Sequence, residues 1–181
     1  MGTAKQPLPV KLVTSLFTGH LALLEAARHR LEEAFGPVGY QSEQLPFDHT
    51  DYYTPEFGPD LIRIILAFER LVDPGELAAI KRRTNDLEAR WLVEDHRQVN
   101  IDPGYVSLSK LVLATTKNHA HRIYLSDGIH AEVTLHYRDG AFHGFPWTYP
   151  DYASPRYCTL FKEIRDAYRR QLRQSLGCFD R

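Results

Sequence analysis

A short and nearly continuous apolar segment, LIRIILAFERL at Leu61–Leu71, sets the strongest limit on the fold of this chain. Ile and Leu fill it almost without interruption, which is typical of a strand that is buried on both faces. Arg63 interrupts its longest apolar run, and no run in the chain approaches the roughly 18 residues that a membrane-spanning helix needs. The segment therefore predicts a central strand of a folded protein and not a membrane span.

The elements around this strand follow a recurring order. Gly36-Pro37 ends one helical pattern, and Asp73 fits the N-cap of a second helix, with Glu76 as its capping-box partner. The other expected elements are strands at Pro9–Phe17, Tyr40–Leu45 and Val99–Ile101 and helices at Leu21–Phe35 and from Asp73 to about Val93. The order strand–helix–strand–strand–helix–strand is that of a ferredoxin-like sandwich, with both helices on one face of an antiparallel sheet, although other α+β folds share it.

The second half of the chain has a different pattern. Ser107–Thr116 is apolar and fits either a short helix or a strand, and two Asp-Gly turns follow it. The elements expected around these turns are a meander of strands at Arg122–Leu125, Ile129–Tyr137 and Ala141–Phe145, and then a closing helix at Tyr157–Leu176. We therefore expect an α+β protein with one domain at 1–181, in which a ferredoxin-like half at 8–102 is extended by the meander and C-terminal helix at 103–181.

Composition and charge restrict the class of protein. The chain has 181 residues, of which 43% are hydrophobic and 25% charged, so it can bury a substantial core. Its two cysteines, Cys158 and Cys178, are too few for a disulfide scaffold or a Cys-rich zinc site. The net charge of −1 gives no overall attraction to nucleic acid or membranes. The first residues, MGTAKQPLP, lack the apolar core of a signal peptide, and we expect a cytoplasmic protein.

The strand at Ile129–Tyr137 carries two sets of side chains, because alternate residues of a strand point to opposite sides. The set expected in the core is Ala131, Val133 and Leu135, and the set on the other side is His130, Glu132, Thr134 and His136. The second set suits acid–base or metal chemistry, although a solvated outer face is the simpler interpretation. His130 and His136 lie roughly 20 Å apart along a strand and cannot share one ion, whereas His130 and Glu132 are roughly 7 Å apart.

A loop at Asp48–Tyr53 is the other acidic and histidine-rich segment. It places Asp48, His49 and Asp51 within four residues. With His130 these side chains are only weak metal candidates, and an aromatic loop of this kind more often covers a core edge. The sequence therefore indicates no metal site and no particular cofactor.

A basic run follows at Lys117–Arg122, with the sequence KNHAHR. Thr115 and Thr116 precede it, and Lys110 lies further upstream. Hydroxyl, ammonium and guanidinium groups together match the recognition of a phosphate or a carboxylate. No glycine-rich phosphate-binding motif accompanies the run, so a basic surface turn is the alternative.

Two other segments present polar or aromatic side chains. In Asn100–Tyr105, NIDPGY, the Asp-Pro-Gly sequence predicts a tight turn at a strand end, where Asp102 is a general base, a metal ligand or the cap of its own turn. In Trp147–Tyr152, WTYPDY, the rings either cover a core edge or stack on a planar ligand. The motifs GxSxG, HExxH and GxGxxG and the EF-hand pattern do not occur.

These segments together resemble a bacterial family of uncharacterised proteins that is catalogued as a domain of unknown function. The segments that carry the resemblance are PVKLVTSLF, FDHTDYYTPEFG, NIDPGY, LVLATTKNHAHRIYL, GIHAEVTL and WTYPDY, which are spread over nearly the whole chain. They are specific as a set and not singly. The resemblance implies no activity and no catalytic residues, only that these polar segments are shared features.

The leading hypothesis is binding of, or catalysis on, an anionic small molecule that is phosphorylated or nucleotide-like. The candidate catalytic residues are Asp102, Glu132 and His121, and the candidate ligand-binding residues are Asn100, Lys110, Lys117, Arg122, Tyr149 and Tyr152. One alternative is a metal-dependent hydrolase. Another is a non-catalytic RNA- or protein-binding module that uses the closing helix, where 156–174 holds six Lys or Arg residues and two acids, a local charge of +4. The sequence does not indicate an oligomeric state.

Overall fold

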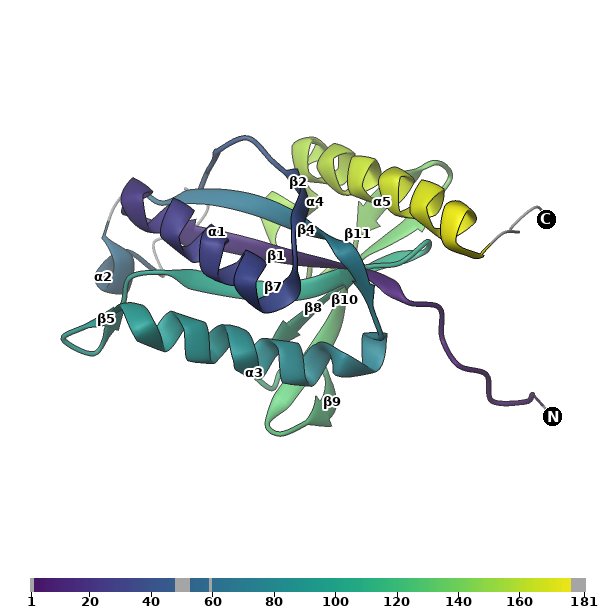
Figure 1. Ribbon diagram of the computed structural model, residues 1–181, viewed down its shortest axis with the longest axis horizontal. Coiled ribbons are helices and arrows are strands. Elements are labelled where there is room, and N and C mark those ends of the chain that lie inside the picture. The colour runs from purple at the N-terminus through teal and green to yellow at the C-terminus, as the bar shows by residue number, and fades with distance from the viewer. Residues whose placement is uncertain (1, 48–52, 59, 177–181) are drawn as a thin grey trace.

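The structure is a computed structural model that describes residues 2–47, 53–58 and 60–176. Within these ranges, no helix is both long and apolar enough to cross a membrane. Antiparallel strands and helices make up the described chain, as Figure 1 shows.

One antiparallel sheet of nine strands forms the centre of the molecule. Its strand order is β11-β10-β8-β7-β1-β4-β2, and β3 pairs with β4 while β9 pairs with β10. The strands are β1 (Val10–Thr18), β2 (Val38–Gln41), β3 (Leu45–Pro46), β4 (Ile62–Val72), β7 (Asn100–Val106), β8 (Lys110–Thr115), β9 (Ile123–Ser126), β10 (Ile129–Arg138) and β11 (Ala141–Gly144). A separate small hairpin joins β5 (Leu92–Val93) to β6 (His96–Arg97).

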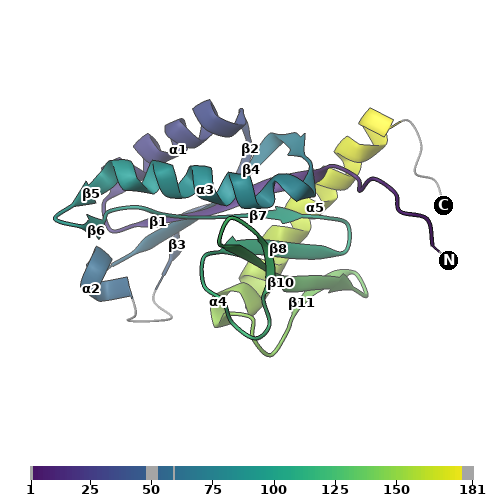
Figure 2. The ribbon, with the colours of Figure 1, turned by 90° about the horizontal axis from the view of Figure 1, so that it is seen from below.

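Helices cover both faces of this sheet. Figure 2 shows α1 (Leu21–Phe35) and α3 (Leu77–Glu88) on one face and α4 (Pro150–Ala153) and α5 (Pro155–Leu176) on the other. Other helical segments are α2 (Thr54–Phe57) and the 3-10 turns η2 (Pro74–Glu76) and η3 (Ala89–Trp91). The expected α+β class is therefore confirmed, with a larger sheet than a four-stranded sandwich has and with helices on both faces.

The alternation of side chains along β1 explains why both faces are covered. All nine residues of β1 are buried. Leu12 and Leu16 pack with β4, α1 and α3 in one core, whereas Val13 belongs to a second core with α5, β8 and β10. The segment Leu61–Leu71, expected as a buried central strand, corresponds to β4, which lies between β1 and β2.

The Asp-Pro-Gly segment does not form the turn that its sequence predicts. Asp102, Pro103 and Gly104 lie inside β7 and pair with Ser15, Thr14 and Val13 of β1. Gly104 is required by close packing, because a Cβ atom there would lie 2.2 Å from the backbone oxygen of Val112. The turn prediction is wrong because two neighbouring strands decide the structure: β1, which is distant in sequence, pairs with the segment, and β8 packs closely against Gly104.

A second correction concerns β10, whose pairing with β8 shifts register between Val133 and Leu135. Ala131 and Val133 pack against β8 and the first residues of α3, as expected. Leu135 instead joins the core beneath α5. The extra residue, Thr134, breaks the strict alternation, so the sequence pattern placed Leu135 on the wrong face of the strand.

Candidate functional site

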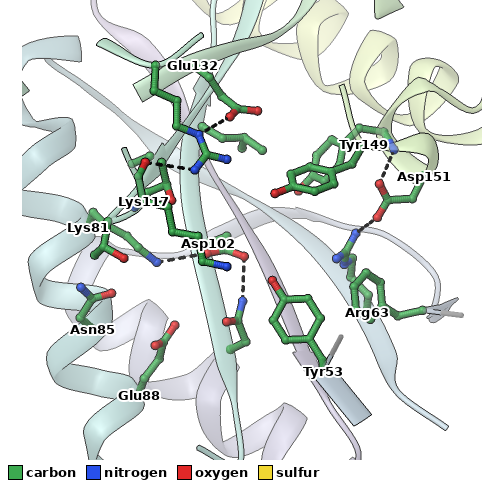
Figure 3. Close-up of a pocket in the computed structure, with 18 of the residues that line it drawn as sticks. Tyr53, Arg63, Lys81, Asn85, Glu88, Asp102, Lys117, Glu132, Tyr149 and Asp151 are labelled. Carbon is green, nitrogen blue, oxygen red and sulfur yellow. Dashed lines mark hydrogen bonds and ion pairs between the residues drawn. The ribbon is translucent and has the colours of Figure 1, made fainter. Parts of the chain in front are cut away.

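A cavity of about 560 Å³ lies where β7 and β8 separate. The two strands pair only between Gly104–Val106 and Leu111–Leu113, after which β8 continues beside β10. This volume is in the range of small-molecule sites, roughly 300–1,000 Å³. The side chains that line the cavity come from α3, β4, β6, β7, β8, β10, α4 and the segments beside them, and ten of them are labelled in Figure 3.

Because the strands separate, the carbonyl oxygen and the N–H of Ile101 have no partner on β8. Two side chains of α3 bind these groups instead. The Lys81 ammonium donates to the Ile101 carbonyl oxygen at 2.9 Å, and the Ile101 N–H donates to Glu88 Oε1 at 2.6 Å. The nitrogen of Pro103 points to the same side as that of Ile101, because backbone directions repeat every two residues. Proline therefore fits at a position where no strand accepts a hydrogen bond.

Asp102 lies at the centre of a polar network on this wall. Its Oδ1 accepts from Lys81 at 3.1 Å and its Oδ2 accepts from Asn100 Nδ2 at 2.7 Å. Burial acts to raise the pKa of Asp102, but the Lys81 charge and the Asn100 hydrogen bond outweigh it and hold the pKa below its usual value. The side chain is 35% exposed, toward the cavity that it lines. Asp102 is therefore an ionised acceptor at neutral pH.

Arg97 links this network to Glu56. Its Nη1 donates to Asn100 Oδ1 at 2.9 Å, and its Nε and Nη2 donate to the two carboxylate oxygens of Glu56 at 2.7 and 2.8 Å. This bidentate pair fixes the guanidinium plane. The orientation of the Asn100 amide toward Asp102 follows from it.

Glu88 differs from Asp102 although both line the cavity. Its side chain is 7% exposed, and Arg97 lies 3.5 Å from its Oε2. Burial raises the pKa of Glu88 above its usual value, and the charge of Asp102 adds to this while Lys81 opposes it. Two neighbouring carboxyl groups thus have pKa values that are shifted in opposite directions, an arrangement common in acid–base sites.

A second carboxylate cluster lies on the opposite wall around Glu132. Its Oε2 accepts from Arg122 Nε at 2.7 Å and lies 3.1 Å from His121 Nε2. The His121 ring stacks on Trp147 with ring centroids 5.5 Å apart. Glu132 is buried, so the interpretation of this strand face as fully solvated is wrong at this position. His121 and Arg122, which precede β9, reach Glu132 of β10 from the loop after β8.

The third charged pair joins Arg63 to Asp151 at the floor of the cavity. The Arg63 guanidinium lies 3.9 Å from the centroid of the Phe47 ring, and Tyr152 lies nearby. Burial opposes the charge of Arg63, but Tyr152 and Asp151 outweigh burial and raise its pKa. This buried pair connects α4 to β4.

Aromatic side chains complete the cavity. Figure 3 shows Tyr53 and Tyr149 beside the cavity, and Tyr149 is 51% exposed. Burial raises the pKa of Tyr53 far above its usual range, and the Asp102 charge adds to the shift. Its hydroxyl is therefore protonated at neutral pH. Tyr152 is 4% exposed and stacks on Phe161, so most of its ring belongs to the core.

The structure brings most of the sequence-predicted residues to one cavity. Those that line it are Asn100, Asp102, Lys117, Arg122, Glu132, Tyr149 and Tyr152. His121 contacts the cavity through Glu132. Lys110 does not join them, because it lies at the far end of β8, opposite His136. His130 packs against Tyr124 instead. Asp48, His49 and Asp51 lie outside the described residues.

Sequence reasoning missed the wall that α3 contributes. Lys81, Asn85 and Glu88 face the cavity at helical spacing. The spacing of these polar residues was a usable signal. Arg63, a charged residue in the buried first half of β4, was another. Across residues 2–47, 53–58 and 60–176, no three His, Cys, Asp or Glu side chains are grouped as a metal site requires.

Comparison with known proteins identifies the family of this chain. A family model described as a domain of unknown function, DUF4416, matches residues 8–168. The chain belongs to the DUF4416 family. The matched region contains every residue that lines the cavity, so the site lies within the family domain. No curated protein and no solved structure matches the chain.

Proposed function

We propose that the cavity binds a small organic anion, with a phosphate or carboxylate group at its β8 end. The observation that carries the proposal is the gathering of hydroxyl, ammonium and guanidinium groups at one corner of a single cavity. Thr115, Thr116, Lys117 and Arg122 all line it there. Groups of these types recognise phosphate and carboxylate in proteins.

The fixed position of Arg122 supports this assignment. Its side chain is only 4% exposed, and it is held by Glu132 and by the carbonyl oxygen of Lys117 at 3.0 Å. A guanidinium that is oriented before the ligand arrives loses little entropy on binding. His121 and Glu132 act here as positioning residues for Arg122.

The aromatic wall supports a planar part in the ligand. Tyr149 exposes half of its side chain beside the cavity, and Tyr53 lies near Asp102. Exposed rings beside a polar cavity suit stacking on a planar group. Any acid–base chemistry on the bound molecule would use Asp102 on one wall and Glu132 with His121 on the other.

We also propose that residues 8–102 form a ferredoxin-like unit that the second half extends. The order β7-β1-β4-β2, with antiparallel neighbours and with α1 and α3 on one face, supports it. In this assignment the cavity lies at the edge of the unit, where β7 leaves β8.

Titration calorimetry with adenosine monophosphate and inorganic phosphate tests the proposed function. We expect binding by the wild-type protein, and a loss of about tenfold in affinity for Lys117→Ala, since one charged contact is worth about 1.4 kcal/mol or more. Lys5→Ala removes an exposed lysine elsewhere and is the matched control. Equal affinity of Lys117→Ala and wild type, or no binding of either probe, would contradict the proposal.

A further inference from the structure

The part of the cavity that β7 and α3 line carries several hydrogen-bond acceptors. Asp102, Asn85 and Glu88 line the cavity near the Lys81 ammonium. Each oxygen of a carboxylate offers about two acceptor positions. Lys81 occupies one position on Oδ1 of Asp102 and Asn100 occupies one on Oδ2, so each oxygen keeps a second position. The exposed third of this side chain borders the cavity.

Asn85 adds a second group to this wall. It is half-buried and lines the cavity, and within the described residues its carboxamide makes no hydrogen bond. Asn85 lies one helical turn after Lys81, which binds Asp102. A carboxamide supplies both a donor and an acceptor to a ligand. Asp102 and Asn85 therefore form an end of the cavity that suits a group rich in O–H or N–H donors.

Ion pairs hold most of the charged side chains that line the cavity. Among the described residues, five cationic side chains line the cavity against four carboxylates. They are Arg63, Lys81, Arg97, Lys117 and Arg122 against Glu88, Asp102, Glu132 and Asp151. Three of these cations are held by carboxylates of the same cavity, in the pairs Arg63–Asp151, Lys81–Asp102 and Arg122–Glu132. A fourth cation, Arg97, is held by Glu56, so ion pairs fix the positions of most of these charged groups before a ligand binds.

From these observations we infer that the ligand is a phosphorylated compound with vicinal hydroxyl groups, such as a sugar phosphate or a nucleotide. The phosphate lies at the Lys117 corner, and the hydroxyl groups donate to Asp102 and contact Asn85. This inference rests on the proposed function, since it names the class of the ligand for the same cavity.

A pair of probes separates the two proposals. Adenosine monophosphate and 2′,3′-dideoxyadenosine monophosphate share the phosphate and the base and differ only in the two hydroxyl groups. We expect the dideoxy compound to bind at least tenfold more weakly, because hydrogen bonds to an ionised group are lost.

Variants test whether Asp102 and Asn85 cause the preference for adenosine monophosphate over the dideoxy compound. In Asp102→Asn and in Asn85→Ala, the ratio of the two affinities is expected to fall toward one, while Asp86→Asn, an exposed carboxylate on α3, leaves it unchanged. Asn85→Ala breaks no hydrogen bond in the described chain and serves if Asp102→Asn does not fold. Equal binding of both monophosphates to wild type overturns this inference and leaves the proposed function intact. Failure of both to bind overturns both.

Discussion

At the scale of single residues, the site depends on side chains that replace a missing strand. Ile101 has backbone groups that a neighbouring strand would normally bind, and Lys81 and Glu88 bind them instead. Buried backbone groups require partners, and an unsatisfied one costs about 1–3 kcal/mol. The same two side chains border the cavity, so they stabilise the protein and shape the site.

Replacing Lys81 tests this structural role. Lys81→Met removes the donor to Ile101 and leaves Asp102 without its cation, so we expect the free energy of unfolding to fall by about 2 kcal/mol. The value is modest because Asp102 is partly exposed, which screens the ion pair. Urea denaturation measures it, with the exposed Arg82→Met as control. An unchanged unfolding midpoint in Lys81→Met would show that Ile101 needs no partner.

The pKa of Glu88 gives a prediction with a definite sign. Burial raises this pKa in the folded protein above the usual value of 4.5, so the folded state binds a proton more tightly than the unfolded state does. Stability therefore falls as the pH rises from about 4.5 to the folded pKa, and it is constant with respect to Glu88 above that window. Glu88→Gln keeps an acceptor for Ile101 and removes the titration. The difference in unfolding free energy between wild type and Glu88→Gln should change in this window, and a constant difference from pH 4.5 to 7 contradicts the assignment.

At the scale of elements, local patterns were sufficient where packing agrees with them. The apolar run of β4, the helical spacing of α1 and α5, and the Asp-Gly turns on both sides of β10 were all predicted from their own residues. The patterns failed at Asp-Pro-Gly and at Thr134, where contacts from strands distant in sequence decide the structure. Local preference is a weak guide wherever a neighbouring backbone approaches closely.

Gly104 provides the test at this scale. In Gly104→Ala the new Cβ would meet the Val112 backbone oxygen at 2.2 Å and the Leu113 side chain at 2.6 Å. Backbone inside a sheet cannot move aside cheaply, so we expect a loss of about 3 kcal/mol in unfolding free energy. Gly39→Ala is the matched control, because the one close contact of its Cβ would be with the flexible Glu69 side chain, at 2.9 Å, and the nearest backbone atoms would lie at 3.8 Å. Thermal or urea denaturation compares the two, and equal stability of both variants contradicts the close packing of β7 and β8.

At the scale of the whole molecule, the cavity joins residues from Phe47 to Tyr152 in sequence. The segment after residue 100 was recognisable because its polar and aromatic residues are close together in the chain. The contributions of α3 and Arg63 were not recognised, because their place in the cavity depends on how β7 and β8 separate. No local pattern encodes that separation.

Several cationic side chains of the closing helix α5 have partners within the protein. Arg156 pairs with Glu43, Lys162 pairs with Asp166, and Arg165 donates to the Leu108 carbonyl oxygen at 2.7 Å. The Arg165 guanidinium also lies 3.5 Å from the centroid of the Tyr137 ring. The Arg165 contacts hold α5 on the sheet and Lys162–Asp166 is a pair within α5, so fewer of these cations are available to a nucleic acid than the residue count suggests.

The location of a bound anion tests the central claim most directly. Titration of nitrogen-15-labelled protein with adenosine monophosphate, followed by NMR, reports which backbone amides change. We predict saturable shifts at Asn85, Asp102, Thr115–Lys117 and Tyr149, which surround the cavity. Shifts confined to α5 or to other surfaces, or no saturable shift at millimolar ligand, would contradict a small-molecule site between β7 and β8.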